Sequence, residues 1–187
     1  DISIVPFRPL AGNSYIPTPK KIGYRKSIIN IQNNSDHECF KWAVTSAVYP
    51  QNTTNPERLS TTLRENSKKF DWSGINFPTP LDQIARYERQ NPDYTIYVYG
   101  YDSGEDFDVL RVCENPEGKK KICLLFLRNK HTSHYCWIKN FNRLLRSEVT
   151  NHHGNHEFCL RCLRYFQTKQ KLEIISKIAL SLEQLEL

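Results

Sequence analysis

The sequence predicts an α+β fold, and three features carry the prediction. Residues 39–48 form an apolar helical pattern that ends before Pro50. From about residue 94 onward the period changes to short stretches rich in β-branched and aromatic residues, which favour strands. Residues 122–127 are a continuous apolar run, typical of a central strand. Helices followed by an antiparallel sheet is the order of an α+β domain.

The first half supplies an arm and the helices. Residues 1–27 are rich in proline and glycine and predict an extended arm. Residues 27–32 alternate enough for a short strand. Ser35 or Asp36 can cap the helix over 39–48, and Asn55 is expected to cap a second helix with Pro56 at its first position. Residues 80–90 predict a short amphipathic helix.

The second half supplies the sheet. Strands are expected over 94–101, 109–112, 122–127 and 134–139, with a basic hairpin turn over 114–121. Helices are expected over 141–149 and 169–187. The chain therefore divides into an arm (1–27), a main domain (28–150) and a tail (151–187).

Composition narrows the functional classes. The 187 residues carry a net charge of +6, which is dispersed and so favours a solvated basic face over a dedicated nucleic-acid groove. No apolar run is long enough to span a membrane. The six cysteines lie mostly singly in apolar contexts, which favours a reducing, intracellular compartment (cytoplasm or nucleus). The absence of methionine favours a processed or recombinant product, or a piece of a longer protein.

Cys39 and His134 are the candidate catalytic pair. A cysteine at a helix start has its thiolate favoured by the helix dipole and free backbone N–H groups. A histidine on a later strand can serve as its base. The alternative is that Cys39 packs a helix start and His134 is a satisfied strand residue.

The remaining parts of such a site are less defined. Backbone N–H groups near Asp36 to Cys39, with Asn33 or Asn34 upstream, could bind an oxyanion. Asn140 is a candidate to orient His134, but on one straight strand the two would be ~20 Å apart. Asn142, Thr132 and Asn129 are alternatives, as is a dyad without a third residue.

Two short blocks resemble known cysteine peptidases. A nucleophile on a helix and a base on the sheet is the papain-like layout. Asp36-x-x-Cys39-Phe40-x-Trp42-Ala43-Val44 is similar to the nucleophile block of OTU deubiquitinases, and His134-Tyr135 is similar to their His-Tyr pair. That family usually has Asp or Asn two residues after the histidine, where this chain has Cys136. The resemblance implies ubiquitin or a ubiquitin-like protein as substrate.

Almost the whole chain also resembles a region encoded by Maverick/Polinton-type mobile elements, often beside their family B DNA polymerase. The blocks that carry this resemblance are residues 13–17, 28–31, 38–44, 74–78, 98–101, 134–140, 143–145 and 158–166. It implies a mobile-element origin and leaves the activity open.

The tail resembles half of a zinc finger. Cys159 and Cys162 have the spacing of the first two ligands of a Cys2His2 finger, but no histidine falls near Ile175. One interpretation is a relic hairpin and helix without metal. The other is a structural zinc held by this pair together with His153 and His156, which lie upstream.

The sequence thus predicts a cysteine peptidase-like domain, plausibly a deubiquitinase or a protease for a ubiquitin-like modifier. It needs no cofactor for catalysis. The rival hypothesis is a non-catalytic adaptor, or a nucleic-acid-associated domain of a transposon DNA polymerase, that uses the basic tail. Neither hypothesis involves a membrane.

Overall fold

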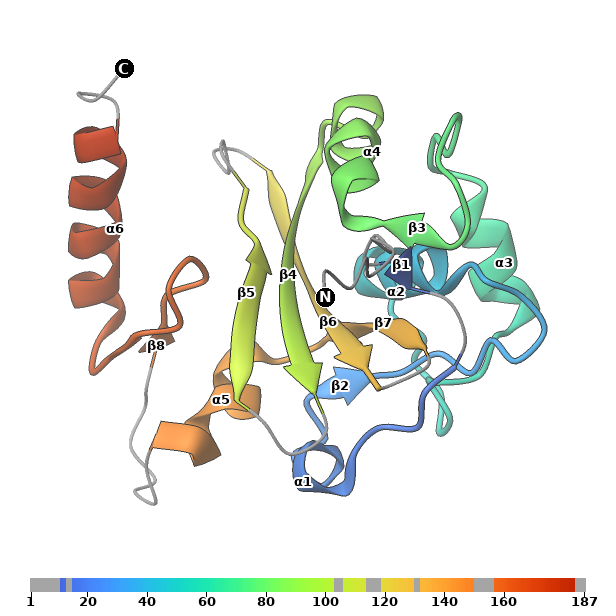
Figure 1. Cartoon of the computed structure of the whole chain (residues 1–187), viewed down its shortest axis with the longest axis horizontal. Coiled ribbons are helices and arrows are strands. Elements are labelled where there is room, and N and C mark those ends of the chain that lie inside the picture. Colours follow the sequence, from blue (N-terminus) through green and yellow to red (C-terminus); the bar gives the residue numbers. More distant parts are fainter. Residues whose placement is uncertain are drawn as a thin grey trace, which may run out of the picture.

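A five-stranded sheet organises the molecule in this computed structural model, which describes residues 11–12, 15–102, 106–113, 119–129, 132–149 and 157–183. The strand order is β2-β7-β6-β4-β5 (Figure 1). The strands are β2 (Ile28–Ile29), β4 (Tyr94–Asp102), β5 (Phe107–Arg111), β6 (Lys120–Arg128) and β7 (Ser133–Ile138). The expected α+β class is confirmed.

The sheet is mixed, so the expected antiparallel sheet is wrong. β4 and β6 pair in parallel, whereas β4–β5, β6–β7 and β2–β7 are antiparallel. The expected hairpin over 114–121 is also wrong, because β5 and β6 lie on opposite sides of β4. The reason is burial: β6 is apolar on both faces and takes a central place, whereas β5 carries the exposed residues Asp108 and Val109 and takes the edge.

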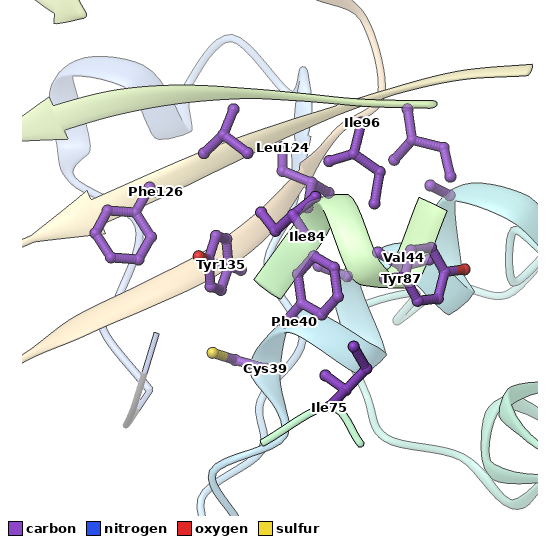
Figure 2. Packing of buried hydrophobic residues seen from close by; sticks show 14 of the residues in the cluster. Cys39, Phe40, Val44, Ile75, Ile84, Tyr87, Ile96, Leu124, Phe126 and Tyr135 are labelled. Carbon is purple, nitrogen blue, oxygen red and sulfur yellow. The ribbon is translucent and has the colours of Figure 1, made fainter. Parts of the chain in front are cut away.

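Helices cover both faces of the sheet. On one face lie α2 (Cys39–Val48) and α4 (Ile84–Gln90), the latter preceded by a 3-10 turn, Leu81–Gln83. Their side chains pack in one cluster with those of β4, β6 and β7: Phe40, Val44, Ile84, Tyr87, Ile96, Leu124, Phe126 and Tyr135 (Figure 2). On the other face lie α1 (Lys20–Gly23) and α5 (Phe141–Val149), which pack in a second cluster with Tyr97, Tyr99, Leu125 and Cys136. Because both faces are covered, the middle of each central strand is buried, over residues 95–101 of β4 and 122–127 of β6.

The second helix begins later than expected. α3 spans Thr61–Ser67, and its cap is Ser60, whose Oγ accepts the Leu63 N–H at 3.1 Å. The expected cap at Asn55 is wrong. The Gln51 side chain donates to the carbonyls of Pro56 and Arg58, each at 2.9 Å, and so holds this stretch as a turn.

The described part of the arm is not simply extended. It contains β1 (Ala11–Gly12), which pairs antiparallel with β3 (Thr79–Pro80), followed by α1. Ile16 and Ile22 are buried, so the arm contributes to the core.

The tail forms a hairpin and a helix. β8 (Glu157–Phe158) pairs with β9 (Tyr165–Phe166), and α6 (Lys169–Glu183) follows. The hairpin is attached to the sheet by the Tyr99 hydroxyl, which donates to the Leu160 carbonyl at 2.8 Å. α6 stands outside the sheet layers (Figure 1). Among the described helices, none has the length and apolar character needed to cross a bilayer.

Candidate active site

Cys39 is the first residue of α2, and its side chain lies against β7. The helix over Cys39–Val48 is as expected. The backbone N–H groups of Tyr135, Phe40 and Cys39 itself are directed at the thiol. Figure 2 shows the Cys39 sulfur at the start of α2, next to Tyr135. The residue that follows His134 therefore contacts the candidate nucleophile.

His134 lies near the start of β7 and is fully buried, with 0% of its surface exposed. Alternation along the strand directs His134 and Cys136 to the face opposite Tyr135. The imidazole ring meets the Tyr15 ring edge-on, with ring centroids 5.6 Å apart. The arm thus contacts the candidate base directly.

Cys39 packs in the same cluster as Tyr135, on the side of the sheet that α2 covers. A charge on Cys39 raises the pKa of both the Tyr135 hydroxyl and the Cys136 thiol, in each case after burial as the larger cause. β2 pairs only with Trp137 and Ile138, which leaves the preceding residues of β7 free of a β2 partner. The structure brings the helix start and the histidine-bearing strand together.

The thiol is not activated in this conformation. Cys39 is 1% exposed, and burial raises the pKa of its thiol to about 12. The N–H groups of Tyr135 and Phe40 offset only part of that rise. The expected effect of the helix start on the thiolate is therefore outweighed, because burial removes the water that would solvate the charge.

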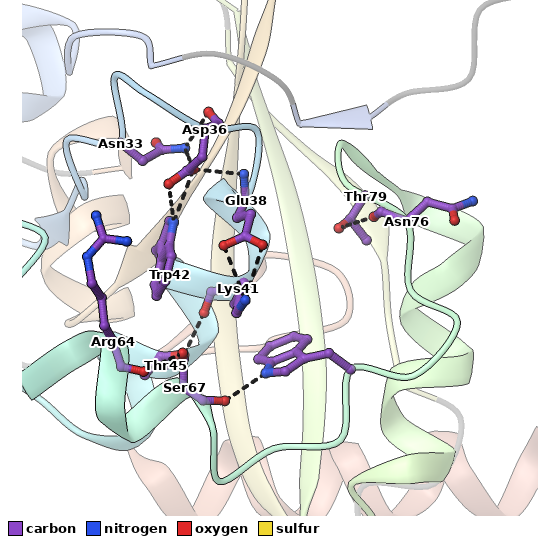
Figure 3. Close-up of polar contacts among 11 residues, drawn as sticks. Asn33, Asp36, Glu38, Lys41, Trp42, Thr45, Arg64, Ser67, Asn76 and Thr79 are labelled. Carbon is purple, nitrogen blue, oxygen red and sulfur yellow. Dashed lines mark hydrogen bonds and ion pairs between the residues drawn. The ribbon is translucent and has the colours of Figure 1, made fainter. Parts of the chain in front are cut away.

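The candidate oxyanion residues organise the start of α2 (Figure 3). Oδ1 of Asp36 accepts from the Glu38 N–H at 2.9 Å, from Trp42 Nε1 at 3.1 Å and from Asn33 Nδ2 at 2.7 Å. The amide of Asn33 is therefore directed at Asp36. Asn34 is exposed in the preceding turn. The N–H groups best placed for an oxyanion at the sulfur are those of Cys39 and Phe40.

The candidates for orienting His134 lie elsewhere or in turns. Asn140 caps α5, since its Oδ1 accepts the Arg143 N–H at 2.9 Å. Asn142 donates to Glu157 at 2.8 Å and so attaches α5 to the tail hairpin. Asn129 accepts the Thr132 N–H at 2.8 Å in the turn before β7. The Tyr15 ring lies against the imidazole.

Cys159 and Cys162 occupy the turn between β8 and β9, with no disulfide between them. The Arg161 N–H donates to Cys159 Sγ at 3.4 Å, and the Arg164 N–H is directed at the Cys162 sulfur. The pKa of the Cys162 thiol is raised, first by burial, and the adjoining Cys159 thiol adds to the rise. His153 and His156 lie outside the described residues. Within the described ranges no group of three or more His, Cys, Asp or Glu side chains could hold a metal ion.

Sequence reasoning missed two contributors to the site. Tyr15 lies in the proline-rich arm, whose local pattern gives no hint of a partner more than a hundred residues away. The Tyr135 N–H is a main-chain donor, which side-chain patterns do not reveal. The only signal for Tyr15 was an aromatic residue beside the apolar Ile16 in an otherwise turn-rich segment.

No family model, curated protein or solved structure matches this chain.

Proposed function

We propose that the chain is a cysteine peptidase-like domain with Cys39 as nucleophile and His134 as base. One observation supports it above the others: the Cys39 thiol lies against the N–H of Tyr135, the residue next to His134. The mixed sheet with helices on both faces provides the helix-to-strand contact that such a site needs. A papain-like relationship is part of the proposal.

The proposed reaction is acyl transfer. His134 takes the proton of the Cys39 thiol as the sulfur attacks the substrate carbonyl carbon. The N–H groups of Cys39 and Phe40 stabilise the oxyanion. The C–N bond then breaks, and His134 returns the proton to the leaving amine. Water hydrolyses the thioester and releases the carboxylic acid product.

The proposed substrate is ubiquitin or a ubiquitin-like protein, by the resemblance of the Cys39 and His134 blocks to OTU deubiquitinases. The direct test is incubation of the full chain with ubiquitin and ubiquitin-like proteins that carry a C-terminal electrophile. We expect a covalent adduct at Cys39. His134→Ala should slow adduct formation at least about a hundredfold, the usual contribution of a general base. His37→Ala is the matched control, since His37 is exposed two residues before Cys39.

Adduct formation at another cysteine, or equal rates in wild type and His134→Ala, would contradict the proposed roles. If Cys39 reacts with a peptide electrophile but with no modifier electrophile, the peptidase proposal stands and the proposal of a ubiquitin-type substrate fails.

A second candidate is a non-catalytic adaptor. The burial of Cys39 and His134 and the raised thiol pKa favour it, because both residues then serve packing. Its contact surface would include the basic tail, where Arg164, Lys169 and Lys171 are exposed. In that case neither electrophile reacts, and Cys39→Ala changes only stability.

We also propose that Cys159 and Cys162 hold a structural zinc together with His153 and His156. The support is the turn geometry: main-chain N–H groups of Arg161 and Arg164 face the two sulfurs, which stabilises thiolates and orients them as metal ligands. Two sulfurs provide half of a tetrahedral site.

We expect purified protein to contain about one zinc per chain. Cys162→Ser should remove it, and His153→Ala with His156→Ala should weaken it at least about tenfold. Cys113→Ser is the control, as Cys113 is a single buried cysteine in the second cluster. Elemental analysis and the thiolate absorption of the cobalt-substituted protein measure both effects. If the purified protein contains no metal, the tail is a relic hairpin and helix that binds none. If the double histidine variant retains zinc, other ligands complete the site.

A further inference from the structure

The arm and β3 both lie against β7, the strand that carries His134. β1 pairs with β3, with Ala11 opposite Pro80 and Gly12 opposite Thr79. β1 also contacts β7, the strand that carries His134. The Thr79 carbonyl in turn accepts the Tyr135 hydroxyl at 3.2 Å. The two short strands therefore lie on the same part of β7 as the candidate pair.

Tyr15 makes the direct contact. Its ring meets the His134 imidazole edge-on at 5.6 Å. Its hydroxyl bonds with the Gln32 side chain, and burial beside Cys136 raises its pKa. The half-buried Tyr15 ring thus lies between solvent and the histidine.

Asn30 attaches the next part of the arm to the domain. Its Nδ2 donates to the Ile16 carbonyl at 2.8 Å and to Thr18 Oγ1 at 3.0 Å. Ile16 is buried, so the segment is held by packing as well as by hydrogen bonds. This attachment sets the position of Tyr15, one residue before Ile16.

We propose that the described arm, residues 11–12 and 15–18, is an intramolecular strap that occupies the place of an extended peptide substrate and keeps the Cys39–His134 site closed. The inference rests on the proposed peptidase function for its biological meaning, and its structural part is testable without any substrate. A main chain that pairs with Thr79 and Pro80 beside β7 is bound as an extended peptide is bound at a sheet edge. The residues in that position, Ala11 and Gly12, are small, so the substrate expected there is an extended polypeptide with small residues opposite β3.

Closure explains why the thiol is unreactive in this conformation. The two-residue strand pair, the Tyr15 ring contact and the Asn30 hydrogen bonds are few enough to break in a local opening without global unfolding. An opened arm exposes His134 and gives Cys39 access to water, which favours the thiolate. Substrate then competes with the arm for β3.

The test is the rate at which iodoacetamide modifies each cysteine of the native full chain, followed by peptide mass spectrometry. We expect Tyr15→Ala to accelerate labelling of Cys39 about two- to tenfold, the range that corresponds to the loss of one aromatic contact. Asn30→Ala should act in the same direction through release of Ile16 and Thr18. Tyr24→Ala is the matched control, because Tyr24 belongs to the same arm but is 66% exposed. It should leave the rate unchanged.

Cys123 is the internal control. It is buried, and its thiol pKa is raised to about 12 by burial, as for Cys39. It belongs to the second cluster together with Ile16 of the arm, so its labelling rate reports whether the arm variants loosen that cluster. Faster labelling of Cys39 with an unchanged rate at Cys123 supports the strap. Equal acceleration of both thiols indicates general loosening and overturns it, as does an unchanged rate at Cys39 in both variants.

Activity separates this inference from the proposed function. If Tyr15→Ala speeds labelling of Cys39 but the protein reacts with no modifier electrophile, the strap proposal stands and the peptidase proposal fails. If the wild-type protein forms the adduct and neither arm variant forms it faster, the peptidase proposal stands and the strap proposal fails.

Discussion

Cys39→Ala is expected to abolish hydrolysis of a ubiquitin-type substrate and to leave the fold nearly intact. The substitution removes the nucleophile, so the rate should fall by several orders of magnitude. The same change deletes one sulfur atom from a buried position, which costs on the order of 1 kcal/mol. Steady-state cleavage and urea unfolding of the same preparations measure both effects.

Cys136→Ala is the matched control for that variant. Cys136 is also fully buried and lies near Cys39, but it has no proposed role in the reaction. It should lose similar stability and retain activity. If Cys39→Ala unfolds far below wild type and neither protein cleaves any substrate, Cys39 is a packing residue and the adaptor hypothesis takes precedence.

Glu88→Ala is expected to produce the largest loss of stability, about 3 kcal/mol. Glu88 pairs with Arg111 at 2.5 Å, and the two side chains are 12% and 16% exposed. Glu88 Oε1 also accepts the Ile96 N–H at 2.6 Å and the Thr95 hydroxyl at 3.1 Å. Removing the carboxylate leaves the largely buried Arg111 guanidinium without its counter-charge. It also breaks the hydrogen bonds and the ion pair that join α4 to β4 and β5.

Two comparisons identify the cause of that loss. Glu88→Gln keeps an acceptor for the Ile96 N–H and removes the charge, so it should be destabilised less than Glu88→Ala. Glu65→Ala breaks the Glu65–Lys68 pair, whose side chains are 68% and 69% exposed, and should change stability by no more than about 0.5 kcal/mol. Equal losses in Glu65→Ala and Glu88→Ala, by urea unfolding, would show that burial does not determine the effect.

The elements that the sequence predicted correctly are those whose bounds depend on short-range residue patterns. The helix over 39–48, the strand at 94 and the helix at 141 begin where the sequence indicates, because apolar spacing and turn residues act within a few positions. The parallel pairing of β4 with β6 was not predictable in this way. A chain order of strand, strand, strand suggests successive hairpins, and only the two-faced burial of 122–127 favours a central position over a neighbouring one.

The same limit applies to the site. Residue types and chain order were enough to propose Cys39 and His134, and the helix start does lie against the histidine-bearing strand. The burial of the pair was not predictable, because it depends on contacts from the arm and from β3. Asn140 caps α5, because β7 ends at Ile138 and the helix begins three residues later.

The position of β5 at the sheet edge has a consequence for association between chains. An edge strand presents unpaired main-chain groups that can template pairing with another molecule. In β5 the Asp108 carboxylate is 60% exposed and bonded to Arg128 at 3.0 Å, and Arg128 also binds Asp102 at 2.9 Å. An exposed carboxylate on the outermost strand makes the approach of a second edge costly, because pairing would remove it from water. We therefore expect Asp108 to disfavour sheet-to-sheet association at β5.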